Sequence, residues 1–255
     1  MTPYQFASNT PIAAIDLDGL EFSLATNSDG HVYVNAHFKV LNSSNLSDEN
    51  IKILMGDLKT KYLELMDRKY AGRQFKGWIT FEYVDKVKPT DYFIEVVEPT
   101  DKRLKLGKGK ANGKVNSIGG QNLVFSTLGL KNSDFATGFS KISTMYNEGS
   151  DFSDGVLHEI GHLFGLLHPW DKKGGGFRQI SSIRDSYLSA AKDPMSDAGQ
   201  ELSANLMNSP GNPNMILGVN FSKKKLTQDQ FGQMYRNLYN KKIGQKQTEN
   251  YEKKN

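Results

Sequence analysis

The chain contains the stretch His158-Glu159-Ile160-Gly161-His162-Leu163-Phe164-Gly165-Leu166-Leu167-His168, which reads HExxHxxGxxH and holds three of the five histidines. Because His158 and His162 are four residues apart, a helix would place both imidazoles on one face, where they can bind one cation. Gly165 can adopt the positive φ that ends a helix, so the chain can turn back and bring His168 in as a third ligand. Three neutral imidazoles leave one tetrahedral position open, which is typical of a catalytic zinc site. Glu159 is then the candidate general base.

A lone histidine on an apolar helix face is usually a satisfied core residue, whereas three at this spacing beside a glutamate favour a metal site. The remaining alternative is a degenerate site that keeps the motif without activity. The other two histidines, His31 and His37, lie apart in the N-terminal part of the chain. We predict surface or packing roles for both.

Composition limits the class of protein. A chain of 255 residues fits one catalytic domain with appendages, and the absence of cysteine means that metal ligands must be histidines or carboxylates. We expect no membrane span, because no apolar run approaches about eighteen residues. The N-terminus also lacks the basic and apolar regions of a signal peptide.

The net charge of +4 is mildly basic, and the excess lies in residues 102–114, in residues 223–225 and after residue 240. A nucleic-acid surface would combine such charge with stacking aromatic residues, which these runs almost lack. We therefore expect solvated loops and no nucleic-acid partner.

Periodicity predicts the elements that precede the motif. Residues 21–42 alternate as a hairpin, Ser47 can cap a long amphipathic helix that ends near Gly72, and residues 77–87 and 91–98 are strand-like. Further predictions are a mobile Lys/Gly-rich loop at 101–120, short strands at 122–126 and 135–146, and Ser153 as the cap of the motif helix.

After the motif, residues 182–191 have a helical pattern. Thr227 and Gln230 form a capping-box pair that starts a C-terminal helix with apolar residues through Tyr239. We expect this helix to pack under the motif helix and the tail from Lys241 to be frayed.

The motif resembles that of metzincin zinc metalloproteases, and so does the order of elements from about residue 21 to residue 240. The resemblance implies an α+β fold, in which a twisted mixed sheet with a long backing helix and the zinc helix forms an N-terminal subdomain, about 21–168. A smaller C-terminal subdomain, 169–240, would hold a methionine turn and a helix, followed by a flexible basic tail, 241–255. It also implies one catalytic Zn²⁺ bound by His158, His162 and His168.

Two methionines are candidates for the turn beneath the zinc. We favour Met207, which small and polar turn-forming residues surround, over Met195; either residue could instead be ordinary core filler. By the same resemblance, residues 208–219 would wall the substrate pocket. Ser209 stands where some metzincins have a tyrosine that assists the transition state, so we assign no oxyanion stabiliser.

The resemblance and the residues together imply hydrolysis of a peptide bond in a protein substrate. Zinc lowers the pKa of a bound water, and Glu159 takes its proton as general base and delivers it to the leaving amine. Metzincin substrates lie extended along the edge strand of the sheet, which we predict to be residues 122–126.

Residues 1–20 resemble the C-terminal end of the core of RHS-repeat proteins, where a YxFxxNxPxxxxDPDGL-like signature closes the shell. The matching residues are Tyr4, Phe6, Asn9, Pro11, Asp16, Asp18, Gly19 and Leu20. Leu17 replaces the usual proline. In that family the shell can cut itself after the leucine and retain its cargo, so the cargo here would begin at Glu21. An alternative interpretation of residues 16–19 is a plain turn; half a calcium loop fits less well, because Asn27 occupies the twelfth position.

An RHS-core end joined to a metalloprotease resembles a polymorphic toxin of interbacterial competition. The resemblance implies delivery into target cells by a secretion system, an RHS shell as partner and a cognate immunity protein. The alternatives are a secreted or surface protease with a nutritional or processing role, and a non-catalytic zinc-stabilised binding module.

Overall fold

A computed structural model describes residues 22–88, 90–106, 109–135, 152–193, 195–208 and 225–243. Its helices are α1 (Asp48–Met66), η2 (Lys102–Leu104), α2 (Asn132–Phe135), α4 (Phe152–Leu163), α5 (Ser181–Lys192), α6 (Asp197–Ser203) and α7 (Gln228–Tyr239). The main-sheet strands are β1 (Phe22–Thr26), β2 (Val32–Ser43), β3 (Arg68–Tyr70), β4 (Arg73–Tyr83), β5 (Phe93–Val97), β8 (Gly113–Val115) and β9 (Asn122–Ser126). Two small hairpins are β6 (Lys105–Leu106) with β7 (Gly109–Lys110), and β10 (Lys173–Gly174) with β11 (Phe177–Arg178).

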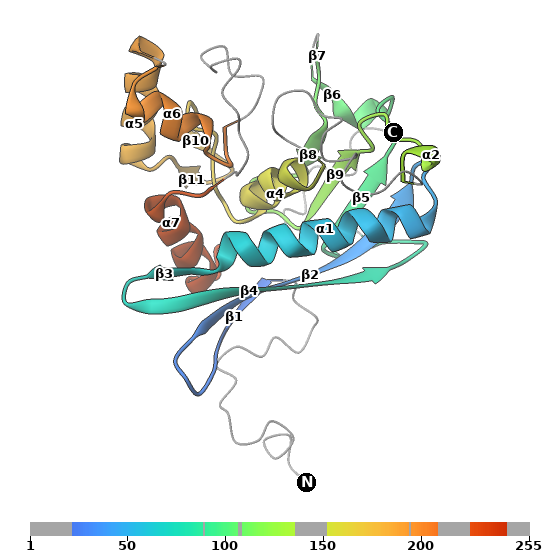
Figure 1. Ribbon diagram of the computed structural model, residues 1–255, viewed down its shortest axis with the longest axis horizontal. Coiled ribbons are helices and arrows are strands. Elements are labelled where there is room, and N and C mark those ends of the chain that lie inside the picture. Colours follow the sequence, from blue (N-terminus) through green and yellow to red (C-terminus); the bar gives the residue numbers. More distant parts are fainter. Residues whose placement is uncertain are drawn as a thin grey trace.

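The main sheet is mixed, as predicted for an α+β fold. Its order is β3-β4-β2-β5-β9-β8, with β1 paired to β2 (Figure 1). Strands β4, β2, β5 and β9 run parallel, whereas β1, β3 and β8 pair antiparallel with their neighbours.

Strand β8 forms one edge of this sheet, so the prediction that residues 122–126 are the edge was wrong. Those residues form β9, which is buried along its whole length between β5 and β8. The prediction of a loop throughout residues 101–120 was also wrong, because η2 and β8 lie within it. Both errors have one cause: β8 is only three residues long and has the sequence Gly-Lys-Val, which carries almost no strand signal.

Helix α1 begins as predicted but ends earlier. The Ser47 side chain accepts a hydrogen bond from the backbone N–H of Asn50, which caps the first turn. The helix ends at Met66 because the next residues pair with β4 as β3. Gly72, the predicted end, instead forms the β3–β4 turn with a φ of 76°.

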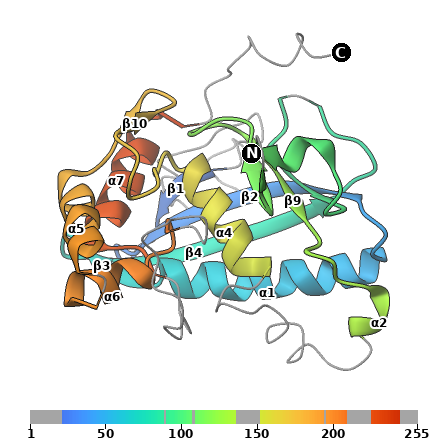
Figure 2. The ribbon, with the colours of Figure 1, turned by 90° about the horizontal axis from the view of Figure 1, so that it is seen from above.

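The core lies between the sheet and helices α1 and α4. Alternate residues of β2 are buried under α1, and the Tyr62 hydroxyl donates to the carbonyl oxygen of Val34. Helix α1 approaches β4 at Gly77, where an added Cβ would meet Met66 at 3.0 Å. Helix α4 packs against α1 and β9 (Figure 2). The first turn of α4 is tied to α1, since Ser153 donates to Asp57 and Lys61 pairs with Asp154 at 3.1 Å.

Among the described residues, only part of the chain lies over the opposite face of the sheet. At β5 and β9, a second apolar cluster of Val97, Leu104 and Val124 places η2 over that face. This second cover explains why both strands are buried on their two faces, as parallel strands usually are.

The remaining predicted elements have mixed outcomes. The hairpin at 21–42 is β1–β2, the strands at 77–87 and 91–98 are β4 and β5, and the helix at 182–191 is α5. Ser153 was predicted to cap the motif helix, but it is a buried residue inside α4. Phe135 ends α2 and does not start a strand; the rest of 135–146 lies outside the described residues.

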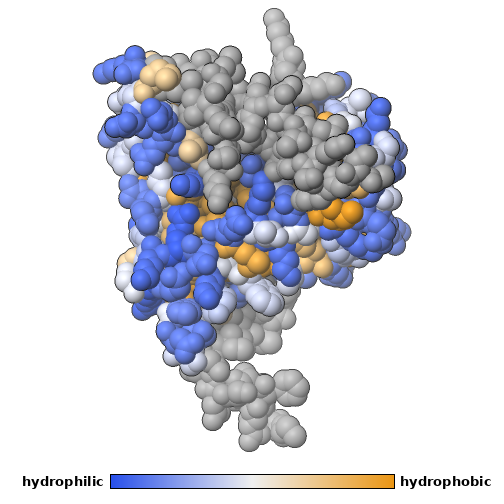
Figure 3. Space-filling model, in the orientation of Figure 1, coloured by the Kyte–Doolittle hydropathy of each residue, from blue (hydrophilic) through white to orange (hydrophobic). Residues whose placement is uncertain are grey.

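On the face shown in Figure 3, the described residues are mainly hydrophilic. On the side that carries α1, hydrophobic side chains gather in a band across the middle of the molecule (Figure 3). Within the described residues, no helix is both long and apolar enough to cross a membrane.

Candidate metal centre

The motif residues 158–162 lie on α4, and the helix ends as predicted. Gly165 has a φ of 79°. Its N–H donates to the carbonyl oxygen of His162 at 2.9 Å, and the N–H of Leu166 donates to that of Gly161 at 3.0 Å. This pair of bonds is the Schellman arrangement, which closes a helix and reverses the chain. The reversal returns residues 166–168 alongside the helix.

The three histidines converge through their Nε2 atoms. The Nε2 of His168 lies 3.2 Å from the Nε2 of His158 and 3.2 Å from the Nε2 of His162. Tetrahedral zinc with Zn–N bonds of about 2.0–2.1 Å holds its ligand nitrogens about 3.3 Å apart. These two separations match that value, and all three ligand atoms lie within 4.8 Å of one another, so the three residues could hold one zinc ion.

Each histidine has its other ring nitrogen anchored by an oxygen. The Nδ1 of His158 lies 2.8 Å from the carbonyl oxygen of Leu206, and that of His162 lies 2.8 Å from the carbonyl oxygen of Leu166. The Nδ1 of His168 lies 3.0 Å from a carboxylate oxygen of Asp171. These oxygens can only accept hydrogen bonds. Each Nδ1 therefore carries the proton, and each Nε2 presents a lone pair. Three lone pairs facing one another repel, and a cation removes that repulsion.

Burial favours the neutral, ligating form of these imidazoles. It lowers the pKa of His162 well below the usual range, and the neighbouring His158 and His168 add to this effect. Burial also lowers the pKa of His168, and the Asp171 carboxylate opposes that shift. The side chain of His168 is nevertheless 27% exposed, so the site can be reached from solvent.

The loop that carries His168 is fixed by side chains from outside the motif. The Trp170 ring stacks on the His168 imidazole, with 4.5 Å between the ring centroids and 5° between the planes. The Gln179 side chain donates to the carbonyl oxygen of His168 at 2.5 Å, and Arg184 of α5 donates to that of Trp170. The third ligand is therefore held by its ring, by its Nδ1 and by its main chain.

Glu159 is buried between α4 and β8. Burial raises the pKa of its carboxyl to about 8, and a hydrogen bond from the backbone of Val115 opposes the rise. An added Cβ at Gly113 would lie 2.8 Å from the Cγ of Glu159 and 2.4 Å from the Phe125 ring. Glycine at position 113 is thus what lets the edge strand approach this glutamate.

Met207 is fully buried and contacts α4 at Gly161, where an added Cβ would lie 2.4 Å from its sulfur. The alternative candidate, Met195, is 66% exposed. Asn205 and Gln230 form a buried side-chain pair through two hydrogen bonds of 2.9 and 3.1 Å. Asn205 also accepts from the N–H of Met207. The capping box of α7 is thereby connected to the segment whose Leu206 carbonyl anchors His158.

Helix α7 was predicted to pack under the motif helix, but it packs mainly on β1 and β3 and touches the chain just after the end of α4. The side chain of Asn237 donates to the carbonyl oxygen of Phe164 at 2.9 Å. An added Cβ at Gly165 would meet this Asn237 at 2.7 Å and the Phe177 ring at 2.5 Å.

The structure places the other predicted residues as follows. The Nδ1 of His37 is hydrogen-bonded to the Oγ1 of Thr80 at 2.8 Å, and His31 lies in the β1–β2 hairpin. Both are therefore outside the triad, as predicted. Residues 1–20, residues 209–219 of the expected pocket wall and residues 244–255 of the tail lie outside the described residues. Sequence reasoning gave no role to Trp170, Asp171 or Asn205. A carboxylate three residues beyond the third histidine was the available signal for Asp171.

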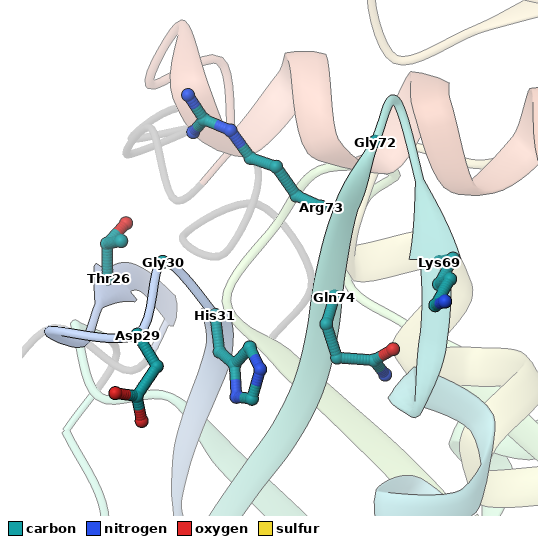
Figure 4. Close-up of a pocket in the computed structure, with 8 residues that line it drawn as sticks. All are labelled: Thr26, Asp29, Gly30, His31, Lys69, Gly72, Arg73 and Gln74. Atoms are coloured by element: carbon teal, nitrogen blue, oxygen red, sulfur yellow. The ribbon is translucent and has the colours of Figure 1, made fainter.

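A separate hollow of about 510 Å³ lies at the β1–β2 and β3–β4 turns (Figure 4). It contains Asp29, His31, Lys69 and Arg73. The side chains of Asp29 and Arg73 point away from each other, and within the described residues the only cluster of candidate metal ligands is the triad on α4 and its following loop. We therefore assign metal binding to the triad and not to this hollow.

One known protein family resembles the part of the chain that holds this site. No curated protein matches the chain. The family model described as Metallo-peptidase family M12B Reprolysin-like matches residues 106–220, somewhat less than half of the chain. The matched segment contains β8, α4 and all three histidines. Residues 106–220 are thus similar to a reprolysin-like metallopeptidase domain, with a histidine triad that can bind zinc.

Proposed function

We propose that this chain is a zinc-dependent endopeptidase of the metzincin type. The observation that carries the proposal is the convergence of three Nε2 atoms, each with its Nδ1 anchored by an oxygen. The match to a metallopeptidase family model across the same residues supports it.

His158, His162 and His168 would hold the ion, which when bound supplies a Lewis acid and an acidified water. Glu159 accepts a proton at its carboxylate and returns it to the nitrogen of the leaving amine. Its burial beside β8 supports this role, because a carboxyl group with a raised pKa can both accept and donate a proton near neutral pH.

Strand β8 replaces β9 as our candidate for the docking edge. The backbone groups of Asn112 and Asn116 bond to β9, through Ser126 at 2.7 Å and Asn122 at 3.1 Å. Because alternate residues of an antiparallel strand face opposite sides, the N–H and C=O groups of Gly113 and Val115 face away from β9. The N–H of Val115 donates to Glu159, so the groups offered to a substrate are the N–H and C=O of Gly113 and the C=O of Val115. In the part of the chain that the structure describes, no further strand pairs on that side. An extended protein substrate would add there as a strand.

The finer domain organisation belongs to the same proposal. Residues 21–168 would form the N-terminal subdomain, 169–240 the smaller C-terminal subdomain, and 241–255 a basic tail. Met207 would form the floor beneath the zinc, and its contact with Gly161 of the motif helix supports that role.

The test is Glu159→Gln, which keeps the size of the side chain and removes the base. We expect a fall of about 10²- to 10⁴-fold in peptide cleavage with one zinc still bound per chain. Zinc content would be measured by elemental analysis and cleavage with a mixture of unfolded proteins. Equal cleavage by the variant would contradict the mechanism. A wild-type protein that binds zinc but cleaves nothing would favour the alternative of a non-catalytic zinc-stabilised module.

We further propose that the protease is the effector domain of an RHS polymorphic toxin, acting on a protein in the target cell. The resemblance of residues 1–20 to an RHS-core end supports this role, with the RHS shell and a cognate immunity protein as partners. Expression in a susceptible cytoplasm should be toxic for the wild type and harmless for Glu159→Gln. N-terminal proteomics of both cultures would identify the cleaved protein. A harmless wild type would favour the alternative, a secreted or surface protease.

A further inference from the structure

We propose that Lys114 selects an acidic residue in the substrate. This inference rests on the proposed peptidase function and adds a substrate class to it. Lys114 is the middle residue of β8 and is exposed, whereas its neighbours Gly113 and Val115 are partly buried. Its side chain is therefore the one through which β8 presents a charge to a strand that docks beside it.

The register of the sheet fixes the face on which Lys114 lies. Lys114 pairs with Val124 of β9, which pairs with Glu95 of β5. Val124 packs with Leu104 of η2, on the face opposite the zinc helix. On the next register row, Gly113 and Phe125 face the helix, since a Cβ at Gly113 would meet Phe125 and Glu159. Lys114 therefore lies on the η2 face.

Two acidic residues on that side of the sheet, Glu95 and Asp101, are already paired with Arg103. Glu95 receives two hydrogen bonds from Arg103, at 2.7 and 2.8 Å, and Asp101 receives another from the same guanidinium at 2.9 Å. Glu95 also lies two strands from Lys114, about 10 Å away at the usual strand spacing. Lys102 is exposed on η2, which contacts β8, and it adds positive charge to this face. Over the described residues, no ion pair of Lys114 is found, so its charge is available to a ligand.

A strand docked on β8 would place one substrate side chain next to the Lys114 charge, and this would make the enzyme select the charge of that side chain. A strand added antiparallel to the free side of β8 places one residue directly opposite Lys114, in a pair without hydrogen bonds, where the Cβ atoms are closest. The side chain of that residue points to the same face as Lys114. Cross-strand opposite charges contribute about 0.2–1 kcal/mol and like charges are unfavourable, which corresponds to a preference of up to about fivefold.

The experiment uses the zinc-loaded full chain and a degenerate decapeptide library, with the products sequenced. The wild type should prefer Glu over Gln by about two- to fivefold at one position relative to the cleaved bond, and disfavour Lys there. Lys114→Glu should reverse the order at that position alone. Raising the salt concentration should weaken both preferences. The matched control is Lys69→Glu, an exposed lysine in the middle of the opposite edge strand β3, which should keep the wild-type preference.

The outcomes separate this inference from the function on which it rests. Cleavage by Lys114→Glu with an unchanged preference would overturn the role of Lys114 and leave the peptidase function standing. Cleavage by the wild type with no charge preference at any position would do the same. A zinc-loaded wild type that cleaves no peptide would overturn both. Circular dichroism and zinc content of each variant would show that the fold and the site are intact.

Discussion

The metal centre has two parts that are built differently. His158 and His162 lie on a buried helix, and both are oriented by main-chain carbonyl oxygens. His168 lies on a loop and is oriented by the side chains of Asp171 and Trp170. The helix pair thus depends on backbone geometry, whereas the loop ligand depends on particular residues that follow the motif.

This difference shows how the two parts tolerate change. A carbonyl acceptor persists through most substitutions of the residue that carries it, so the anchors of the helix pair are robust. The anchors of His168 disappear with single substitutions at Asp171 or Trp170. Substitutions should therefore displace His168 more readily than His158 and His162. Gly165 is the exception, because it lies between the helix and the loop.

The largest effect is expected for Gly165→Ala, which would distort the turn between α4 and the loop that carries His168. The new Cβ would be strained at a φ of 79° and would meet Phe177 at 2.5 Å and Asn237 at 2.7 Å. We expect the free energy of unfolding, measured with urea, to fall by about 3 kcal/mol. Zinc affinity should fall as well, because His168 moves relative to the helix.

Gly30→Ala is the matched control for this prediction. Gly30 has a similar φ of 76°, but nothing lies within 4 Å of an added Cβ. The control should lose about 1 kcal/mol and keep its zinc affinity. Equal losses of stability in the two variants would mean that backbone strain alone is responsible. The contacts of Phe177 and Asn237 at Gly165 would then have no role in fixing the turn.

The intermediate effect is expected for Asp171→Asn, which removes the charge that anchors His168. Substitution of a residue that orients a zinc-binding histidine typically costs about 10- to 100-fold in metal affinity. The asparagine oxygen can still accept from Nδ1, so we expect a loss near tenfold, measured by competition with a chelator. Asp185→Asn on the exposed surface of α5 removes the same charge and should leave zinc affinity unchanged. A variant at Asp171 that binds zinc as tightly as this control would contradict the asymmetry between the two parts.

The sequence predicted the helix pair better than the surroundings of the loop ligand, for a physical reason. The i, i+4 spacing and the glycine act locally, so His158, His162, Gly165 and the turn back to His168 could be predicted from spacing. The pairing of Asn205 with Gln230, or of Leu206 with His158, joins residues that are 25 and 48 positions apart. Nothing in either segment alone indicates its partner.

The same distinction applies to the fold. The N-cap at Ser47 and the capping box at Thr227 are local signals, and both predictions are confirmed. Strand β8 is stabilised by pairing with β9 and lacks strand propensity of its own, so it was missed and β9 was placed at the edge. The end of α1 was misplaced because β3 forms only by pairing with β4.

The smallest effect is expected for Trp170→Leu, which removes the stacking on His168 and leaves the Asp171 anchor in place. Aromatic pairs contribute about 0.5–1.5 kcal/mol beyond the area that they bury, so zinc affinity should fall by about two- to tenfold. Trp170→Phe keeps a ring in the stack and should recover most of the loss, which a purely structural role for the residue's bulk would not predict. In a Trp78→Phe background, Trp170 is the only tryptophan, and its fluorescence should respond to zinc because His168 lies 4.5 Å from it. If the fluorescence does not change when zinc is added and Trp170→Leu keeps the wild-type zinc affinity, Asp171 alone would orient His168.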